Sequence, residues 1–536
     1  MKKITIPFSE TGYFSDLILK YLDSEEELKE FYNPTFTPES FAERISLKSK
    51  EPINRDLLFE ELSKQYAHIE EVADTVRNNI LSIKNQKTFT ITTGHQLCLL
   101  SGPLYVVYKI LTAINLSEQL CKHYPGYHFV PVFWMATEDH DVEEINHVNL
   151  FNKKLEWNTE GFTGSVGRMS TEGMHLFCHQ LREILGEGER AEEITQIVEQ
   201  AYLQQKNIAN ATRYLINYLF GKFGLVILDA DTKPFKESFS AIAKEELEDN
   251  ITHKKVSETI HHLSEKKLIS KPQVAPREIN LFYIKDNIRE RIVQKGEKYI
   301  LVNHTLQWNE NEMMQELALY PEHFSPNVLL RPLFQEKILP NIAYVGGGAE
   351  IAYWLELKLL FEHFNIQMPA LLLRHSALII DNVSRSKMNK LNIAVNDIFK
   401  TEEELIRNFV KSKNNDLISL HDERQKLEFI FRALAEKIVP MDATLKPAVE
   451  AELQKTLNGL KNIESKTQRA LKLRHENEVN QIIKLKQKLF PNNILQERYE
   501  NIFAYILKFG FNFIDELKLQ LNSFESEFSV LEVEMK

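Results

Sequence analysis

Five short apolar segments recur along the chain, and each of them ends in a polar or glycine-bearing turn. Four of them occupy residues 88–93, 128–136, 223–228 and 370–374, and the fifth forms the end of the stretch 329–345. Continuous apolar runs of this length are typical of strands buried on both faces of a parallel sheet. A mostly apolar stretch, residues 103–121, separates the first two and is long enough for a crossover helix. The pattern predicts an α/β fold whose ligands collect at the carboxyl ends of the strands.

The rest of the chain shows helical periodicity or turn-rich patterns that divide it into units. Residues 1–85 carry apolar positions at three- and four-residue intervals, which predicts a helical packing layer. Residues 280–303 contain short strand-like runs separated by DN and KGE turns, which predicts an antiparallel meander. The predicted units are N-terminal helices with the first part of the core (1–150), a first insertion (151–222), a core strand (223–232), a second insertion with the meander (233–326), the last part of the core (327–385), a helical arm (386–490) and a segment that packs back on the core (491–536).

The arm has the pattern of a coiled coil. It contains two long helical segments, roughly 400–438 and 446–489. In the second, apolar positions step by three or four residues, at Val449, Leu453, Leu457, Leu460, Ile463, Thr467 and Leu471. A helix of about 40 residues extends on the order of 60 Å. Such a helix needs a partner, which is the preceding helix, a second subunit or both, and we expect a homodimer.

Composition narrows the class of protein. The 536 residues are 43% hydrophobic and 26% charged, as in ordinary globular proteins, and the formal net charge is −11. This charge argues against a broad nucleic-acid surface, and neither a targeting segment nor a membrane span is evident, so we expect a cytoplasmic protein. The three cysteines form no CxxC pair, which excludes the usual structural zinc sites and a disulfide framework. We expect all three to be packing residues, with Cys98 as the only candidate for a reactive thiol.

The first predicted loop, which follows residues 88–93, has features of an anion site. Free N–H groups and the dipole at the start of the crossover helix suit a phosphate or carboxylate. Two of the candidates lie four residues apart on one helical face. The candidate binding residues here are Gly94, His95, Gln96, Ser101, Gly102, Tyr105 and Lys109. The alternative to an anion site is a tight turn between strand and helix with polar residues at its surface.

The second loop places Glu138, Asp139, His140 and Asp141 directly after an apolar strand. Such a group is costly near a core unless it binds something, which favours catalysis. Asp139 and His140 are candidates for the general base, and Glu138 for holding a substrate ammonium. The flanking residues Trp134 and Asn146 are candidate binding residues.

Two other interpretations of this acidic loop remain open. Asp141 and Glu144 have the spacing of a capping box and could simply start a helix. His140, Asp141 and His147 could ligate a metal, but their spacing matches no standard site, so no metal site is predicted.

A third loop contains Gly346, Gly347 and Gly348, followed by Glu350 at the start of a helix. The spacing is not GxGxxG, so a dinucleotide site is unsupported, and close backbone approach to a ligand is favoured over a packing turn. Arg331 is a candidate anion clamp or part of a structural salt bridge.

The motifs TGHQLCLLSGPLYVVYK, VPVFWMATEDHDVEEIN, FGLVILDAD and RPLFQEKILPNIAYVGGGAEIAYWLELK, in this order before a helical arm, resemble the cysteine-adding enzymes of bacillithiol biosynthesis. The resemblance covers nearly the whole chain. It implies a Rossmann-like core with two connecting-peptide insertions, a coiled-coil arm used for dimerisation, and the joining of cysteine to glucosaminyl-malate. The chain departs from the family at His95, where glutamine is usual, which favours a binding role for this residue.

The resemblance also implies how the site works. Amide formation from a carboxylate and an amine requires activation, most simply by ATP or another nucleotide. The acids from Glu138 to Asp141 would then position and deprotonate the sugar amine. Two other classes stay open, namely a metal-dependent hydrolase that uses the acidic loop and a non-catalytic assembly protein that uses the arm.

Overall fold

The computed structural model describes residues 1–32, 37–69, 71–413 and 420–534. At its centre is a five-stranded sheet with the order β13-β12-β2-β3-β6. Every neighbouring pair of strands in it is parallel. The strands are β2 (Thr88–His95), β3 (His128–Met135), β6 (Val226–Asp229), β12 (Asn341–Gly346) and β13 (Ala370–Leu373). The five predicted strands and the α/β class are confirmed.

The crossover helix α6 (Leu104–His123) packs against β2, β3 and β12. Its segment contains no glycine or proline, and most of its side chains are buried, as expected for a helix that is apolar nearly all round. The N-terminal layer contains α2 (Asp16–Leu22), α3 (Phe41–Lys48), α4 (Arg55–Tyr66) and α5 (Asp74–Ser82). These helices confirm most of the predicted packing layer.

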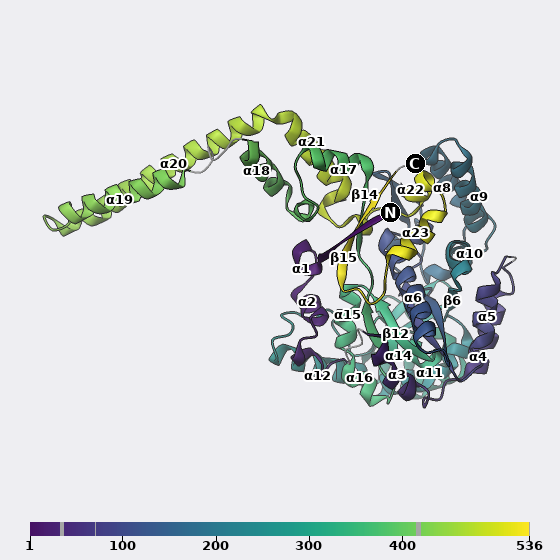
Figure 1. The fold of residues 1–536 in the computed structure, drawn as a ribbon. Coiled ribbons are helices and arrows are strands. Elements are labelled where there is room, and N and C mark those ends of the chain that lie inside the picture. The colour runs from purple at the N-terminus through teal and green to yellow at the C-terminus, as the bar shows by residue number, and fades with distance from the viewer. Residues whose placement is uncertain (33–36, 70, 414–419, 535–536) are drawn as a thin grey trace.

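The first residues of the chain depart from that prediction. Residues 2–7 form a strand, β1 (Lys2–Pro7), which pairs antiparallel with β15 (Glu527–Val533). A third strand, β14 (Ala377–Asp381), pairs parallel with β15. The two ends of the chain therefore meet in one small sheet beside the body (Figure 1).

The first insertion packs behind the carboxyl end of β3. It consists of a hairpin and three helices, which are β4 (His147–Leu150), β5 (Lys153–Glu156), α8 (Met174–Leu185), α9 (Glu189–Leu203) and α10 (Ile208–Phe220). Its turn at 165–167 contacts the loop that follows β3.

The second insertion supplies an antiparallel sheet, which confirms the predicted meander. The order of strands is β10-β9-β8-β7-β11. Its elements are α11 (Lys233–Asp249), α12 (Ile251–Glu265), β7 (Leu281–Lys285), β8 (Ile288–Lys295), β9 (Lys298–Leu301), β10 (Gln307–Asn309), α13 (Glu310–Leu319) and β11 (Phe324–Pro326). The core then resumes with α14 (Arg331–Ile338), β12, α15 (Gly348–Leu355) and α16 (Lys358–His363).

The arm projects away from the body as two helices that lie side by side (Figure 1). They are α19 (His421–Ile438) and α20 (Lys446–Arg474), and neither of them has a buried side chain. The second predicted segment breaks at His475, where α21 (Glu476–Leu489) begins. Residues 414–419 of the first predicted segment lie outside the described residues, and α18 (Glu402–Lys413) precedes them.

The C-terminal segment returns to the body through α22 (Phe503–Phe509) and α23 (Asn512–Gln520). Buried residues of both helices belong to the main hydrophobic core, as the sequence predicts. Among the helices that the structure describes, none is both long enough and apolar enough to cross a membrane.

Candidate active site

A cavity of about 660 Å³ opens at the carboxyl edge of the parallel sheet. It lies between the loops that follow β2, β3 and β12 on one side and the sheet of the second insertion on the other. The predicted residues that line it are Gly94, His95, Gln96, Tyr105, Lys109, Trp134, Glu138, Asp139, His140, Arg331, Gly347, Gly348 and Glu350. The three loops selected from the sequence therefore converge on one site.

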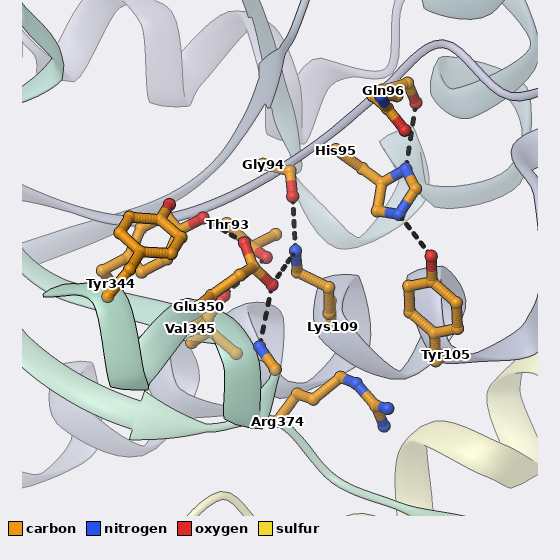
Figure 2. A network of polar contacts seen from close by, with 12 residues as sticks. Thr93, Gly94, His95, Gln96, Tyr105, Lys109, Tyr344, Val345, Glu350 and Arg374 are labelled. Carbon is orange, nitrogen blue, oxygen red and sulfur yellow. Dashed lines mark hydrogen bonds and ion pairs between the residues drawn. The ribbon is translucent and has the colours of Figure 1, made fainter. Parts of the chain in front are cut away.

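Lys109 and Glu350 form the centre of a buried polar network in the core wall of the cavity (Figure 2). Lys109 Nζ donates to the carbonyl of Gly94 and, at 2.7 Å, to Glu350 Oε2. Glu350 also accepts from the Gly347 N–H at 2.8 Å and from the Tyr344 hydroxyl at 2.6 Å. Burial alone would raise the pKa of Glu350, but Lys109 and these hydrogen bonds lower it to about 2. The network ties β2, α6 and the glycine loop together.

His95 is held as a neutral imidazole. Its Nδ1 lies 3.1 Å from the carbonyl oxygen of Gln96, which can only accept, so Nδ1 carries the proton. Nε2 then accepts from the Tyr105 hydroxyl at 2.8 Å (Figure 2). Burial, reinforced by the charge of Lys109, lowers the pKa of His95 to about 4. This geometry suits His95 to positioning Tyr105 at the cavity.

Asp139 is the most strongly held acid of the second loop. Its Oδ2 accepts from Gln96 Nε2 at 2.8 Å, and its Oδ1 accepts from the His140 N–H at 2.7 Å. Burial would raise the pKa of Asp139, but hydrogen bonds from His140 and Gln96 and the nearby Arg289 hold it well below its ordinary value. Asp139 is therefore a carboxylate at neutral pH and a weak base.

Glu138 is already paired. Its carboxylate accepts from the ammonium of Lys236, which is fully buried on α11 and also donates to the Phe324 carbonyl at 2.8 Å. The sequence predicted that Glu138 holds a substrate ammonium. In the structure, the ammonium of Lys236 occupies that position instead.

The first insertion supports the acidic loop from behind. The Val166 N–H donates to the Asp139 carbonyl at 2.7 Å, and the Gly167 N–H donates to the Thr137 carbonyl at 2.8 Å. A Cβ at Gly167 would lie 2.6 Å from the Thr137 Cβ, so only glycine allows this approach. The loop is thus fixed by backbone contacts before any ligand arrives.

Five arginines of the cavity were missed from the sequence, namely Arg277, Arg289, Arg291, Arg374 and Arg498. Arg289 donates to His140 Nδ1 and lies 4.0 Å from the centroid of the Phe282 ring. The alternation in RERIVQ places Arg289 and Arg291 on one face of β8, a signal that could have identified both. Arg374 stands at the carboxyl end of the fifth predicted strand, a position that could have identified it, whereas nothing local indicated that Arg498 would reach the site.

Most of the guanidinium groups at the cavity form no ion pair with a carboxylate of the described residues. Arg374 pairs with the buried Glu497 at 2.7 Å. By contrast, Arg331 donates to Gln335 at 3.0 Å and to the Tyr353 hydroxyl at 3.1 Å, both neutral groups. Within the described residues, the cavity arginines without an ion pair to a carboxylate are Arg277, Arg289, Arg291, Arg331 and Arg498. The cavity therefore favours anionic ligands.

The prediction of an anion site at the start of α6 is wrong, because other parts of the chain already bind this helix end. The Leu104 N–H donates to the Glu500 carbonyl at 2.8 Å, and Asn501 Nδ2 donates to the Gly102 carbonyl at 2.7 Å. The C-terminal segment thus covers this helix end, and neither Ser101 nor Gly102 lines the cavity. Gly102 has a φ of +74°, so its role is to form the turn.

Asp141, Asn146 and Gly346 also lie outside the cavity lining. Asp141 precedes the short helix α7 (Val142–Ile145), but its side chain makes no capping hydrogen bond, so the capping box is not formed. In the part of the chain that the structure describes, no group of three His, Cys, Asp or Glu side chains is placed to share a metal ion. The set His140, Asp141 and His147 is accordingly not brought together.

The fold and the cavity define a Rossmann-like protein with a helical arm and a cavity rich in cationic side chains. Residues 1–375 match the family described as "Bacillithiol biosynthesis BshC, N-terminal Rossmann-like domain". Residues 377–533 match "Bacillithiol biosynthesis BshC, C-terminal coiled-coil domain". The chain therefore belongs to the BshC family of bacillithiol biosynthesis, as the motifs in the sequence indicated.

Curated relatives agree along the full length. A Flavobacterium johnsoniae protein described as "Putative cysteine ligase BshC" is 43% identical over 530 residues, which cover 98% of this chain and 99% of its own. A protein of the same description from Flavobacterium psychrophilum is 42% identical and covers 98% of both chains. Another from Christiangramia forsetii is 40% identical, also with 98% of both chains covered.

Proposed function

We propose that this chain is a ligase that joins the carboxyl group of cysteine to the amine of glucosaminyl-malate. The observation that carries the proposal is the group of guanidinium side chains that face the cavity without an ion pair to a carboxylate. The malate part of this substrate is a dianion, and the cysteine carboxylate and a nucleotide phosphate are anions too. Family membership supports the reaction class.

Two arginines from different elements support this proposal as the groups that would bind these anions. Arg331 begins α14 and hydrogen-bonds only neutral side-chain groups, so its charge is free to bind a carboxylate. Arg289, on β8, lies across the cavity beside His140. Arginines on opposite walls can hold two anionic groups of one substrate, or one anion from each substrate.

The acidic loop handles the amine. Asp139 is ionised at neutral pH because hydrogen bonds hold it as a carboxylate, so it attracts the sugar ammonium. His140 is exposed beside it and is the candidate base that removes the proton before the amine attacks, once Arg289 turns from His140 Nδ1 to a substrate anion and frees that nitrogen. The predicted role of Asp139 thus changes from base to electrostatic anchor.

Activation of the cysteine carboxylate requires a cosubstrate, and we propose ATP. Attack of the carboxylate on a phosphorus atom of ATP forms a mixed anhydride and releases the remaining phosphate portion. The amine then attacks the carbonyl carbon, the amide forms, and the bound phosphate or nucleotide leaves with the bonding electrons. Cations around the cavity stabilise the negative charge of both steps.

The purified protein, cysteine, glucosaminyl-malate and ATP test the proposal, with mass spectrometry to detect the amide product. We expect product only in the complete mixture and little product when glucosamine replaces glucosaminyl-malate. If product forms when cell extract is added but not when ATP is the only addition, the activating compound is one other than ATP. No product under either condition would contradict the ligase.

The arm supports a homodimer, which we also propose. Its two helices pair within one chain, yet large apolar side chains remain exposed, with Phe429 71% and Ile430 58% exposed. A second copy could cover this face and form a larger helical bundle. Light scattering on the purified chain measures the mass directly.

A further inference from the structure

We infer that Cys121, His128 and Asn79 form a thiol site that exchanges with low-molecular-weight disulfides. The site lies at the amino edge of the parallel sheet, away from the cavity. Cys121 is near the end of α6, and His128 is the first residue of β3. Cys121 Sγ lies 3.9 Å from His128 Nδ1, and His128 Nε2 lies 2.8 Å from Asn79 Oδ1. This is the order of contacts that activates the nucleophile in Cys-His-Asn enzymes.

The surrounding structure fixes the imidazole in the form that accepts a proton from sulfur. Asn79 Nδ2 donates to the Gly224 carbonyl at 2.7 Å, which leaves Oδ1 as the acceptor facing His128. Nε2 of His128 must therefore carry the ring proton, and Nδ1 is a free base directed at Cys121. A Cβ at Gly224 would lie 2.6 Å from Asn79 Nδ2, so glycine makes room for this amide.

The thiol is accessible to small molecules. A cleft of about 500 Å³ is lined by Cys121, His128 and Asn79 together with Ser117 and Phe223. His128 is exposed and Cys121 is half-buried, whereas Cys98 and Cys178 are buried. The sequence predicted three packing cysteines and named Cys98 as the only candidate for a reactive thiol, but the structure gives access to Cys121 instead. A half-buried sulfur in a cleft excludes bulky partners and admits small ones.

The environment of the sulfur fits a general-base mechanism. The Phe129 N–H donates to Sγ at 3.4 Å, which stabilises negative charge on sulfur during attack. Burial raises the pKa of the Cys121 thiol, so the resting group is protonated and needs a base when it reacts. Although His128 is exposed to the cleft, its ring is partly covered by the protein, and this partial burial lowers its pKa, so the imidazole is neutral and can accept that proton.

The exchange step balances without any further reagent. His128 takes the proton of Cys121 as Sγ attacks one sulfur of the disulfide RSSR. A new Sγ–S bond forms, the old S–S bond breaks, and RS⁻ leaves and takes the proton from His128. Cys121 is oxidised to a mixed disulfide, and the released half of RSSR is reduced to a thiol.

The full-length protein and 5,5′-dithiobis(2-nitrobenzoic acid) test the proposal, because each exchange releases a coloured thiolate. We expect one fast equivalent per chain, which peptide mass spectrometry places on Cys121. Cystine is expected to modify the same residue. His128→Gln, which keeps a hydrogen-bonding group but removes the base, is expected to slow the fast phase on the order of tenfold.

A matched thiol separates activation from mere exposure. In Cys121→Ser combined with Ser46→Cys, the only accessible thiol is at an exposed position on α3. We expect this thiol to react more slowly than Cys121 in the unchanged chain, a comparison that does not depend on folding of the His128 variant. Equal rates in these two proteins, or fast labelling elsewhere than Cys121, would overturn the proposal.

Discussion

The two walls of the cavity are built in different ways. In the core wall, the buried Lys109 and the half-buried Glu350 pair with one another and bond to nearby backbone groups. In the insertion wall, Arg289 and Arg291 extend from one strand and have no carboxylate ion pair within the described residues. The comparison teaches that charge in a cavity has two uses. We propose that the core wall maintains the shape of the cavity and that the insertion wall, the sheet of the second insertion, binds ligand.

The largest effect is expected from breaking the core wall. Lys109→Met removes the buried partner of this ion pair and leaves the half-buried Glu350 carboxylate without its cation. We expect the free energy of unfolding to fall by about 2–3 kcal/mol, measured by urea denaturation, because the carboxylate left behind is only partly exposed. The double variant Lys109→Met/Glu350→Gln should recover much of this stability. A loss below about 1 kcal/mol in the single variant would show that the pair does not maintain the wall.

A substitution in the insertion wall should lower activity while leaving stability nearly unchanged. Arg289→Met is expected to lower kcat/KM about 30-fold, or about 2 kcal/mol, because a desolvated anion contact is lost. The free energy of unfolding should change little, because Arg289 has no carboxylate ion pair in the described chain. Lys295→Met, an exposed change on the same strand, is the control. Equal activity of the two variants would remove Arg289 from the binding wall.

The pH dependence of stability tests whether the core wall holds His95 as a neutral imidazole. The pKa of His95 is about 4 in the folded chain and about 6.5 when exposed, so between these values the unfolded state binds the extra proton. Stability must therefore fall as pH drops from 6.5 towards 4. His95→Gln should reduce this slope by up to about 1.4 kcal/mol per pH unit, measured by denaturation at several pH values. An unchanged slope would mean that His95 is not held neutral.

The smallest effect on catalysis is expected from the arm. Phe429→Lys combined with Ile430→Lys places charge on the exposed apolar face and should convert the proposed dimer to monomers in light scattering. Activity per chain should remain, because the cavity is lined by residues outside α19 and α20. Lys426→Glu, a nearby exposed change, should leave the dimer intact. A monomeric unchanged chain would contradict the dimer itself.

The core could be predicted from the sequence because buried parallel strands are continuous apolar runs. The loops after β2, β3 and β12 followed from the same rule, since their polar residues stand directly after those runs. Thirteen predicted residues, from Gly94 to Glu350, line the cavity for this reason.

What could not be predicted depends on distant parts of the chain. Glu500 covers the start of α6, and Arg498 reaches the cavity, although almost 400 residues separate both from that helix. The strand at Lys2–Pro7 is short, and its partner begins at Glu527, so no local pattern indicated the pairing. The only sequence signal for Arg289 and Arg291 was the alternation of residues along β8. Whether these side chains face the cavity depends on how the sheet of the second insertion packs against the core.

The pairing of β1 with β15 has a consequence for synthesis of the protein. The first strand leaves the ribosome more than 500 residues before its partner exists. At about 5–20 residues per second, β1 waits roughly half a minute or longer with an open edge. Arg498 and the cover over α6 arrive in the same final stretch. The site is therefore completed only late in synthesis, and truncation before Arg498 should remove function even where the five-stranded sheet is intact.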